Sequence, residues 1–87
     1  MKKAISFQQT AFEDYIEFAE RDKQLFMKIN KLIKDIEREP FSGLGMPEPL
    51  KYKRSGLWSR RINHEDRLVY QITGDTIILY SCKGHYI

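Results

Sequence analysis

A ten-residue segment, 40–49, divides this chain into two halves that must fold differently. It holds all three prolines of the chain and two of its five glycines, Gly43 and Gly45. So many turn residues leave no room for a regular helix or strand. Before the segment, apolar residues recur at helical spacing, and after it short apolar runs are separated by turns. Helices in one half and strands in the other predict an α+β domain.

The first half is expected to form a short strand at 4–7 and then two helices. The first helix, starting near Gln8 or Thr10, has an apolar stripe at 3.6-residue spacing: Phe12, Tyr15, Ile16 and Ala19. The second helix follows Asp22, which can cap it, and ends at Glu39 because a proline comes next. Its expected buried stripe is longer: Leu25, Ile29, Leu32, Ile33 and Ile36.

The second half is expected to be strand-rich. Candidate strands cover 50–53, 57–62, 67–72 and 76–83, and a tight turn at Gly74 joins the last two. The last strand is apolar on both faces, which is typical of an interior strand. We therefore expect a single domain over 1–87, with an antiparallel sheet of three to four strands covered on one face by the helices.

The charge of the chain is unevenly distributed. Residues 51–87 hold seven Lys and Arg against three acids, whereas residues 1–50 hold eight against nine. A basic half suggests a polyanionic partner, although a solvated charged surface would give the same count. The single cysteine, Cys82, cannot form an internal disulfide, and it fits a reducing cytoplasm better than a metal site. No apolar run is long enough to span a membrane, and we read no signal peptide at the N-terminus.

An acid in the 40–49 segment, with a histidine and several arginines after it, supplies the groups needed to cleave RNA without a metal or cofactor. RNA carries its own nucleophile, the 2′-hydroxyl, so cleavage requires a base, an acid for the departing 5′-oxygen, and cations for the transition state. Glu48, between Pro47 and Pro49, is the candidate base, and His85 is the candidate acid. Tyr86 could stack on a base or donate to a phosphate. Taken singly, Glu48 also reads as an exposed loop residue and His85 as a frayed chain end.

Candidate phosphate-binding residues are Arg61 and Arg67, with Lys51 as a further cation. In the strand 67–72, Arg67 opposes an apolar set and should point to the open face of the sheet. In the strand 57–62, alternation does not decide whether Arg60 or Arg61 points there.

Several segments of the chain resemble the YoeB-type toxins of the RelE superfamily. They are Ile33-Lys34-Asp35, Pro40-Phe41, Pro47-Glu48-Pro49-Leu50-Lys51, Ser55-Gly56-Leu57-Trp58-Ser59-Arg60-Arg61-Ile62, Arg67-Leu68-Val69-Tyr70 and His85-Tyr86. The resemblance covers nearly the whole chain. It implies a microbial-ribonuclease-like fold and an endoribonuclease that cuts mRNA in the ribosomal A site and inhibits translation. One residue departs from the pattern, since Ile87 follows Tyr86 where the related chains end.

The resemblance also implies site roles and partners. Glu48 would be the base, His85 the acid and Arg67 the support of the phosphate, with Tyr86 beside the acid. Lys51 and Arg61 would be auxiliary cations, so the resemblance favours Arg61 over Arg60. The implied partners are mRNA, the ribosome and a YefM-type antitoxin, and a homodimer stays open.

Two other functions compete with RNA cleavage. A non-catalytic RNA- or protein-binding module of the same fold would need the basic face but not His85. A ParE-like gyrase poison belongs to the same superfamily, but the set of Glu48, Arg67 and His85 argues against it.

Overall fold

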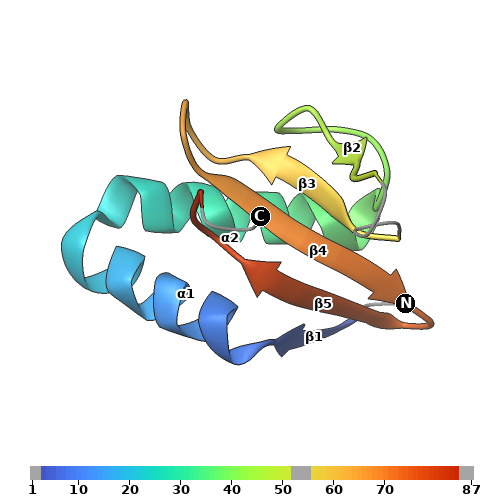
Figure 1. Cartoon of the computed structure of the whole chain (residues 1–87), viewed down its shortest axis with the longest axis horizontal. Helices are drawn as coiled ribbons and strands as arrows, with labels where there is room; N and C mark the ends of the chain where they lie inside the picture. The colour runs from blue at the N-terminus through green and yellow to red at the C-terminus, as the bar shows by residue number, and fades with distance from the viewer. Residues whose placement is uncertain (1–2, 52–55, 85–87) are drawn as a thin grey trace.

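The computed structural model describes residues 3–51 and 56–84. Its elements follow the expected order, one strand, two helices and then strands (Figure 1). They are β1 (Ala4–Phe7), α1 (Gln9–Arg21), α2 (Lys23–Arg38), β2 (Glu48–Pro49), β3 (Trp58–Arg61), β4 (Arg67–Thr73) and β5 (Thr76–Ser81).

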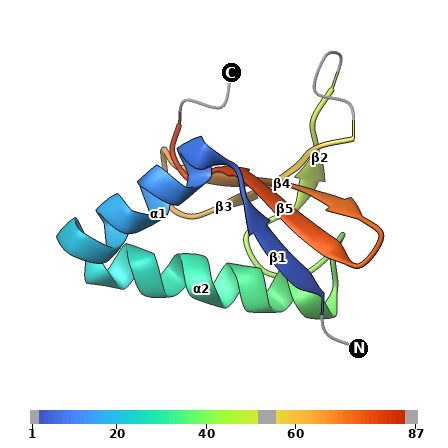
Figure 2. The ribbon, with the colours of Figure 1, turned by 90° about the horizontal axis from the view of Figure 1, so that it is seen from below.

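The strands form one five-stranded sheet in the order β1-β5-β4-β3-β2, and both helices pack on one of its faces (Figure 2). The core lies between these two layers, because its buried apolar residues come from α1, α2 and the inner face of β4 and β5. It includes Ala11, Phe18, Ile29, Leu32, Ile36, Leu68, Tyr70, Ile77 and Leu79. This arrangement confirms the predicted α+β class with helices on one face.

The sheet is mixed, whereas the sequence predicted an antiparallel one. β1 pairs in parallel with β5, from Ala4 opposite Thr76 to Phe7 opposite Leu79, while the other neighbours are antiparallel. Parallel strands cannot be joined by a hairpin, and β1 and β5 are separated by most of the chain. The local pattern of 4–7 predicted the strand correctly, but it carries no information about its partner.

α2 was predicted closely. The Asp22 carboxylate accepts a hydrogen bond from the Leu25 N–H at 3.1 Å, and the helix ends before Glu39 as expected. Its buried residues include the predicted Ile29, Leu32, Ile33 and Ile36, together with Asp35, which was not expected inside. Neither α1 nor α2 is long and apolar enough to cross a membrane.

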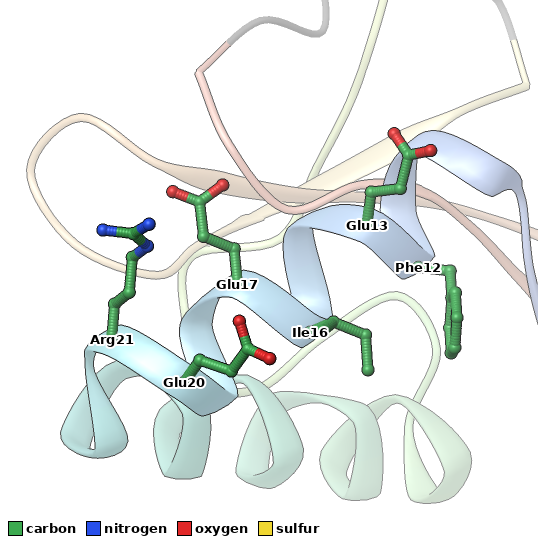
Figure 3. Close-up of a pocket in the computed structure, with 6 residues that line it drawn as sticks. All are labelled: Phe12, Glu13, Ile16, Glu17, Glu20 and Arg21. Carbon is green, nitrogen blue, oxygen red and sulfur yellow. The ribbon is translucent and has the colours of Figure 1, made fainter.

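The stripe predicted for α1 was wrong at three of its four positions, because Tyr15 packs half-buried against the core while Phe12, Ile16 and Ala19 are exposed. The buried residues of α1 are Ala11, Asp14 and Phe18, whereas Phe12 and Ile16 are exposed. The buried face is displaced because it includes a polar residue: the Asp14 carboxylate accepts a hydrogen bond from the Cys82 N–H at 2.9 Å. Figure 3 shows Phe12 and Ile16 lining a shallow hollow on α1 together with Glu13, Glu17, Glu20 and Arg21.

β2 begins earlier than predicted. The paired residues are Glu48 and Pro49, so Glu48 lies in the sheet rather than in the loop, and the described part of the predicted strand 50–53 is outside β2. β3 and β4 match the predicted strands to within one residue at each end, and Gly74 adopts a positive φ of 57° in the predicted hairpin turn. β5 is an interior strand, buried on its helix face and half-buried on the other.

Candidate active site

The sheet face that points away from the helices carries a line of polar residues across β2, β3 and β4. Glu48 lies directly opposite Ser59, and Arg61 lies directly opposite Arg67. Opposed residues share a face of a sheet, and so do alternate residues such as Ser59 and Arg61. The four side chains therefore gather on one open face, although they come from three separate strands.

Glu48 and Arg67 are in direct contact. Arg67 Nη1 donates to Glu48 Oε1 at 2.8 Å and to Ser59 Oγ at 3.1 Å. The Arg67 side chain is 23% exposed and the Glu48 side chain 55% exposed. No other acceptor among the described residues bonds to the Arg67 guanidinium, so none of these residues occupies Nε or Nη2, which could donate to an anion.

Arg61 adds a second cation to this face. It is exposed, and its position opposite Arg67 brings two guanidinium groups onto neighbouring strands. Like charges directly opposite each other destabilise an antiparallel pair. Among the described residues only Glu48 forms an ion pair with either guanidinium, so these residues leave an excess of positive charge that a phosphate group would neutralise.

The structure answers the question that alternation left open on β3. Arg60 is fully buried on the helix side of the sheet, where its guanidinium pairs with Asp35, whereas Arg61 lies on the open face. Asp35 is the signal that could have predicted this arrangement. An acid within an apolar helix stripe needs a buried counter-charge, and Arg60 shares its strand face with Trp58 and Ile62.

Of the remaining predicted site residues, the structure describes Lys51 but not His85 or Tyr86. Lys51 is exposed and lies two residues beyond β2. His85 and Tyr86 lie outside the described residues, as do Lys53 and Arg54, two of the basic residues counted in 51–87. Gly84, which precedes His85, packs against the turn between β3 and β4, and a Cβ there would lie 2.9 Å from the Glu65 carbonyl oxygen. That turn leads into Arg67 two residues later.

Ser59 is a site residue that sequence reasoning missed. It is fully buried, and its hydroxyl accepts a hydrogen bond from the Arg67 guanidinium. Its position two residues before Arg61 could have indicated it, because alternate residues of a strand share a sheet face.

Within residues 3–51 and 56–84 no group of three or more His, Cys, Asp and Glu side chains is arranged to hold a metal ion. Burial, with the nearby carboxylates of Asp14 and Asp66, raises the pKa of the free Cys82 thiol to about 12, which keeps it in the unreactive thiol form near neutral pH.

Two helices on one face of a mixed five-stranded sheet, with a carboxylate and arginines on the other, define a RelE-like α+β protein. The solved structure of the YoeB dimer from Staphylococcus aureus superposes with a TM-score of 0.92 and 47% sequence identity, covering 99% of this chain and all of that one. A heterotetrameric YoeB–YefM toxin–antitoxin complex from the same organism gives a TM-score of 0.91 at 47% identity over the same shares, 99% and 100%.

Sequence comparison identifies the family. Residues 7–86 match the family described as "YoeB-like toxin of bacterial type II toxin-antitoxin system". Toxin YoeB of Escherichia coli K12 is 50% identical over 78 residues, which cover 90% of this chain and 93% of that protein. This chain belongs to the YoeB-like toxins of bacterial type II toxin–antitoxin systems.

Proposed function

We propose that this chain is an endoribonuclease that cleaves mRNA in the ribosomal A site and thereby inhibits translation. Glu48 removes the proton from the RNA 2′-hydroxyl, whose oxygen attacks the adjacent phosphorus. His85 protonates the departing 5′-oxygen, so the products are a 2′,3′-cyclic phosphate and a free 5′-hydroxyl. The reaction as proposed needs no metal or cofactor, because the RNA supplies the nucleophile and the side chains supply the base, the acid and the cations.

The observation that carries this proposal is the contact between Glu48 and Arg67. A base for the 2′-hydroxyl must lie within about 3 Å of it, and a cation must touch the oxygens of the same phosphate. The 2.8 Å contact places a carboxylate and a guanidinium at this separation. When RNA binds, the phosphate accepts from the available Nε and Nη2 of Arg67 while Glu48 faces the neighbouring ribose. Arg61 and Lys51 are the auxiliary cations.

The proposed acid, His85, has a tyrosine neighbour, Tyr86, that would stack on a base or donate to the phosphate. Both lie outside the described residues, so their assignment rests on the family resemblance. It is supported by the path of the chain, because Gly84 packs at the turn that precedes Arg67.

The shape of the site supports a dependence on the ribosome. Glu48 is more than half exposed and Arg61 lies on an open sheet face, so these residues cannot by themselves enclose a nucleotide. Reaction rates depend strongly on holding reacting groups in line, and an open face cannot do this for a free, flexible RNA. An mRNA that the A site already holds would meet that requirement.

The protein partners follow from relatives. The S. aureus relative was solved both as a dimer and in a complex with YefM. We propose that this chain likewise pairs with a YefM-type antitoxin, can form a homodimer and acts in the cytoplasm, where its substrate is.

The test is to map mRNA 5′ ends in a translation extract with and without the protein. New ends that cluster within A-site codons and vanish when ribosomes are omitted are expected. A His85→Gln variant separates cleavage from simple binding. If that variant inhibits translation as strongly as the unmodified protein and no new ends form with either, the chain is a non-catalytic binding module.

A further inference from the structure

Arg60 is the most heavily engaged side chain that the proposed reaction does not use. It is fully buried, and its Nη1 donates to Asp35 Oδ2 at 2.6 Å and to the Leu44 carbonyl oxygen at 3.1 Å. Its Nη2 donates to the carbonyl oxygens of Glu39 at 2.5 Å and Ser42 at 2.9 Å. Every one of these acceptors belongs to the end of α2 or to the segment that follows it.

The same segment, residues 39–45, is fixed by further contacts, and we call it the anchor loop. Tyr70 donates its hydroxyl to the Pro40 carbonyl oxygen at 2.6 Å and accepts from Arg60 Nε at 3.1 Å. The Leu44 N–H donates to Asp35 Oδ2 at 2.9 Å. Gly43 passes so close that a Cβ there would lie 2.2 Å from Asp35 Oδ2, at a φ of 115° that favours glycine.

The anchor loop leads directly to Glu48. Its last residue, Gly45, accepts from the Arg61 N–H at 2.6 Å, and only Met46 and Pro47 separate it from Glu48. The strand that carries Glu48 has only two residues, and one more backbone hydrogen bond follows it, from the Leu50 N–H to the Leu57 carbonyl oxygen at 2.8 Å. With so short a pairing to β3, the position of Glu48 depends on the loop that leads into the strand.

Arg61 and Arg67 are positioned differently. They lie on β3 and β4, which pair over four residues from Trp58 opposite Tyr70 to Arg61 opposite Arg67. The two cations are fixed by the sheet itself, whereas the carboxylate reaches them at the end of a loop. A displacement of the anchor loop would therefore change the distance between Glu48 and Arg67, while the two arginines would stay in place.

We propose that Arg60 is a positioning residue for RNA cleavage: with Asp35 it holds the anchor loop so that the Glu48 carboxylate meets Arg67 and the RNA. This inference rests on the proposed function, in which Glu48 is the base. Two adjacent residues of β3 then contribute to the site from opposite faces of the sheet. Arg60 positions the base from the helix-covered face, and Arg61 supplies a cation on the open face. Asp35 supports the arrangement, because the Leu44 N–H and the Arg60 guanidinium lower its pKa to about 2 and keep it ionised.

The test is a double-mutant cycle on the rate of single-turnover mRNA cleavage on programmed ribosomes. Arg60→Lys is made in the unmodified protein and in Glu48→Gln. Lysine keeps the charge, but its single ammonium nitrogen cannot replace the three guanidinium nitrogens through which Arg60 bonds to Asp35, Tyr70 and the anchor loop. A displaced base should lower the rate about 100-fold in the unmodified protein, with affinity for ribosomes changed less than about threefold. In Glu48→Gln, Arg60→Lys should cause no further loss, because the group that it positions is already gone.

Two further variants keep the test decisive. Gly43→Ala disturbs the anchor loop without changing Arg60, so it replaces Arg60→Lys if that variant does not fold, and the same loss is expected. Arg38→Gln is the matched control. Arg38 also contacts Asp35, at 2.9 Å, but its side chain is 80% exposed and, among the described residues, forms no hydrogen bond to the anchor loop, so the rate should not change.

The outcomes separate this inference from the proposed function. If Glu48→Gln lowers the rate and Arg60→Lys lowers it further by the same factor in both backgrounds, Arg60 does not act through Glu48 and the positioning role is wrong. Unchanged cleavage by a folded Arg60→Lys protein also overturns it. If Glu48→Gln cleaves at the normal rate, the assignment of the base fails, and the positioning role fails with it.

Discussion

Replacing Glu48 with glutamine should abolish most of the activity while leaving the fold nearly intact. Glutamine keeps the size of the side chain and a carbonyl oxygen that can still accept from Arg67 Nη1, which is 2.8 Å from the carboxylate. It loses only the negative charge and the ability to take a proton. Glu48→Gln therefore separates base catalysis from the geometry of the site.

The expected sizes of the two effects differ widely. General base catalysis contributes about 10² to 10⁴ in rate, which corresponds to about 3 to 5 kcal/mol of transition-state stabilisation. The Glu48 side chain is 55% exposed, and an exposed ion pair contributes about 0 to 1 kcal/mol to stability. For a domain of this size, that limits the change in melting temperature to less than about 8 °C. A rate loss of this size cannot come from unfolding.

The assay is single-turnover cleavage of mRNA on programmed ribosomes, with a thermal melt of the same preparation. Glu13→Gln, an exposed carboxylate on α1, is the matched control and should cleave at the normal rate. A Glu48→Gln protein that cleaves within about threefold of the unmodified rate would show that another group takes the proton.

Three more predictions concern residues around the site and in the core. Ser59→Ala removes one of the two acceptors that hold Arg67, so cleavage should slow about tenfold; an unchanged rate in the single-turnover assay would mean that Glu48 alone orients the guanidinium. The pKa of Asp35 is lowered from 3.8 to about 2, first by the Leu44 N–H and then by Arg60, so its contribution to stability is present above pH 3.8 and is lost as the pH falls toward 2. Acid unfolding followed by circular dichroism should therefore show that the stability advantage of the unmodified protein over Asp35→Asn shrinks between pH 4 and 2, and an advantage that grows in this range would contradict the cause. Burial raises the pKa of Cys82 to about 12, so iodoacetamide at pH 8 should label the native protein far more slowly than the protein in denaturant, and equal rates would contradict its burial.

Local pattern predicted the elements of this fold well where burial is apolar and regular. The stripe of α2 and the turn at Gly74 depend on spacing and turn chemistry within a few residues, and both were confirmed. The stripe of α1 failed because Asp14 is buried by a hydrogen bond to Cys82, 68 positions along the chain. The parallel pairing of β1 with β5 was not predicted for the same reason, since it depends on contacts between residues far apart in the sequence.

The candidate site divides in a similar way. The residue types needed for RNA cleavage were visible in the sequence, and the structure brings Glu48 to Arg67 and places Arg61 opposite Arg67 on the same face. The inward position of Arg60 was not predictable from alternation on β3 alone, because it depends on Asp35 of α2 as the partner. Ser59 was missed because a small polar residue in a strand gives no signal until its neighbours across the sheet are known. The positions of His85 and Tyr86 stay predictions.

The most direct test of the account removes a single oxygen atom from the substrate. An mRNA with one 2′-deoxynucleotide immediately 5′ to the cleaved bond is presented on programmed ribosomes, beside the same mRNA with ribose at that position. If the 2′-hydroxyl is the nucleophile that Glu48 activates, the ribose substrate is cut to a 2′,3′-cyclic phosphate and the deoxy substrate is not cut at that bond. Cleavage of both substrates at equal rates would mean that water attacks the phosphorus, and the roles assigned to Glu48, Arg67 and His85 would be wrong.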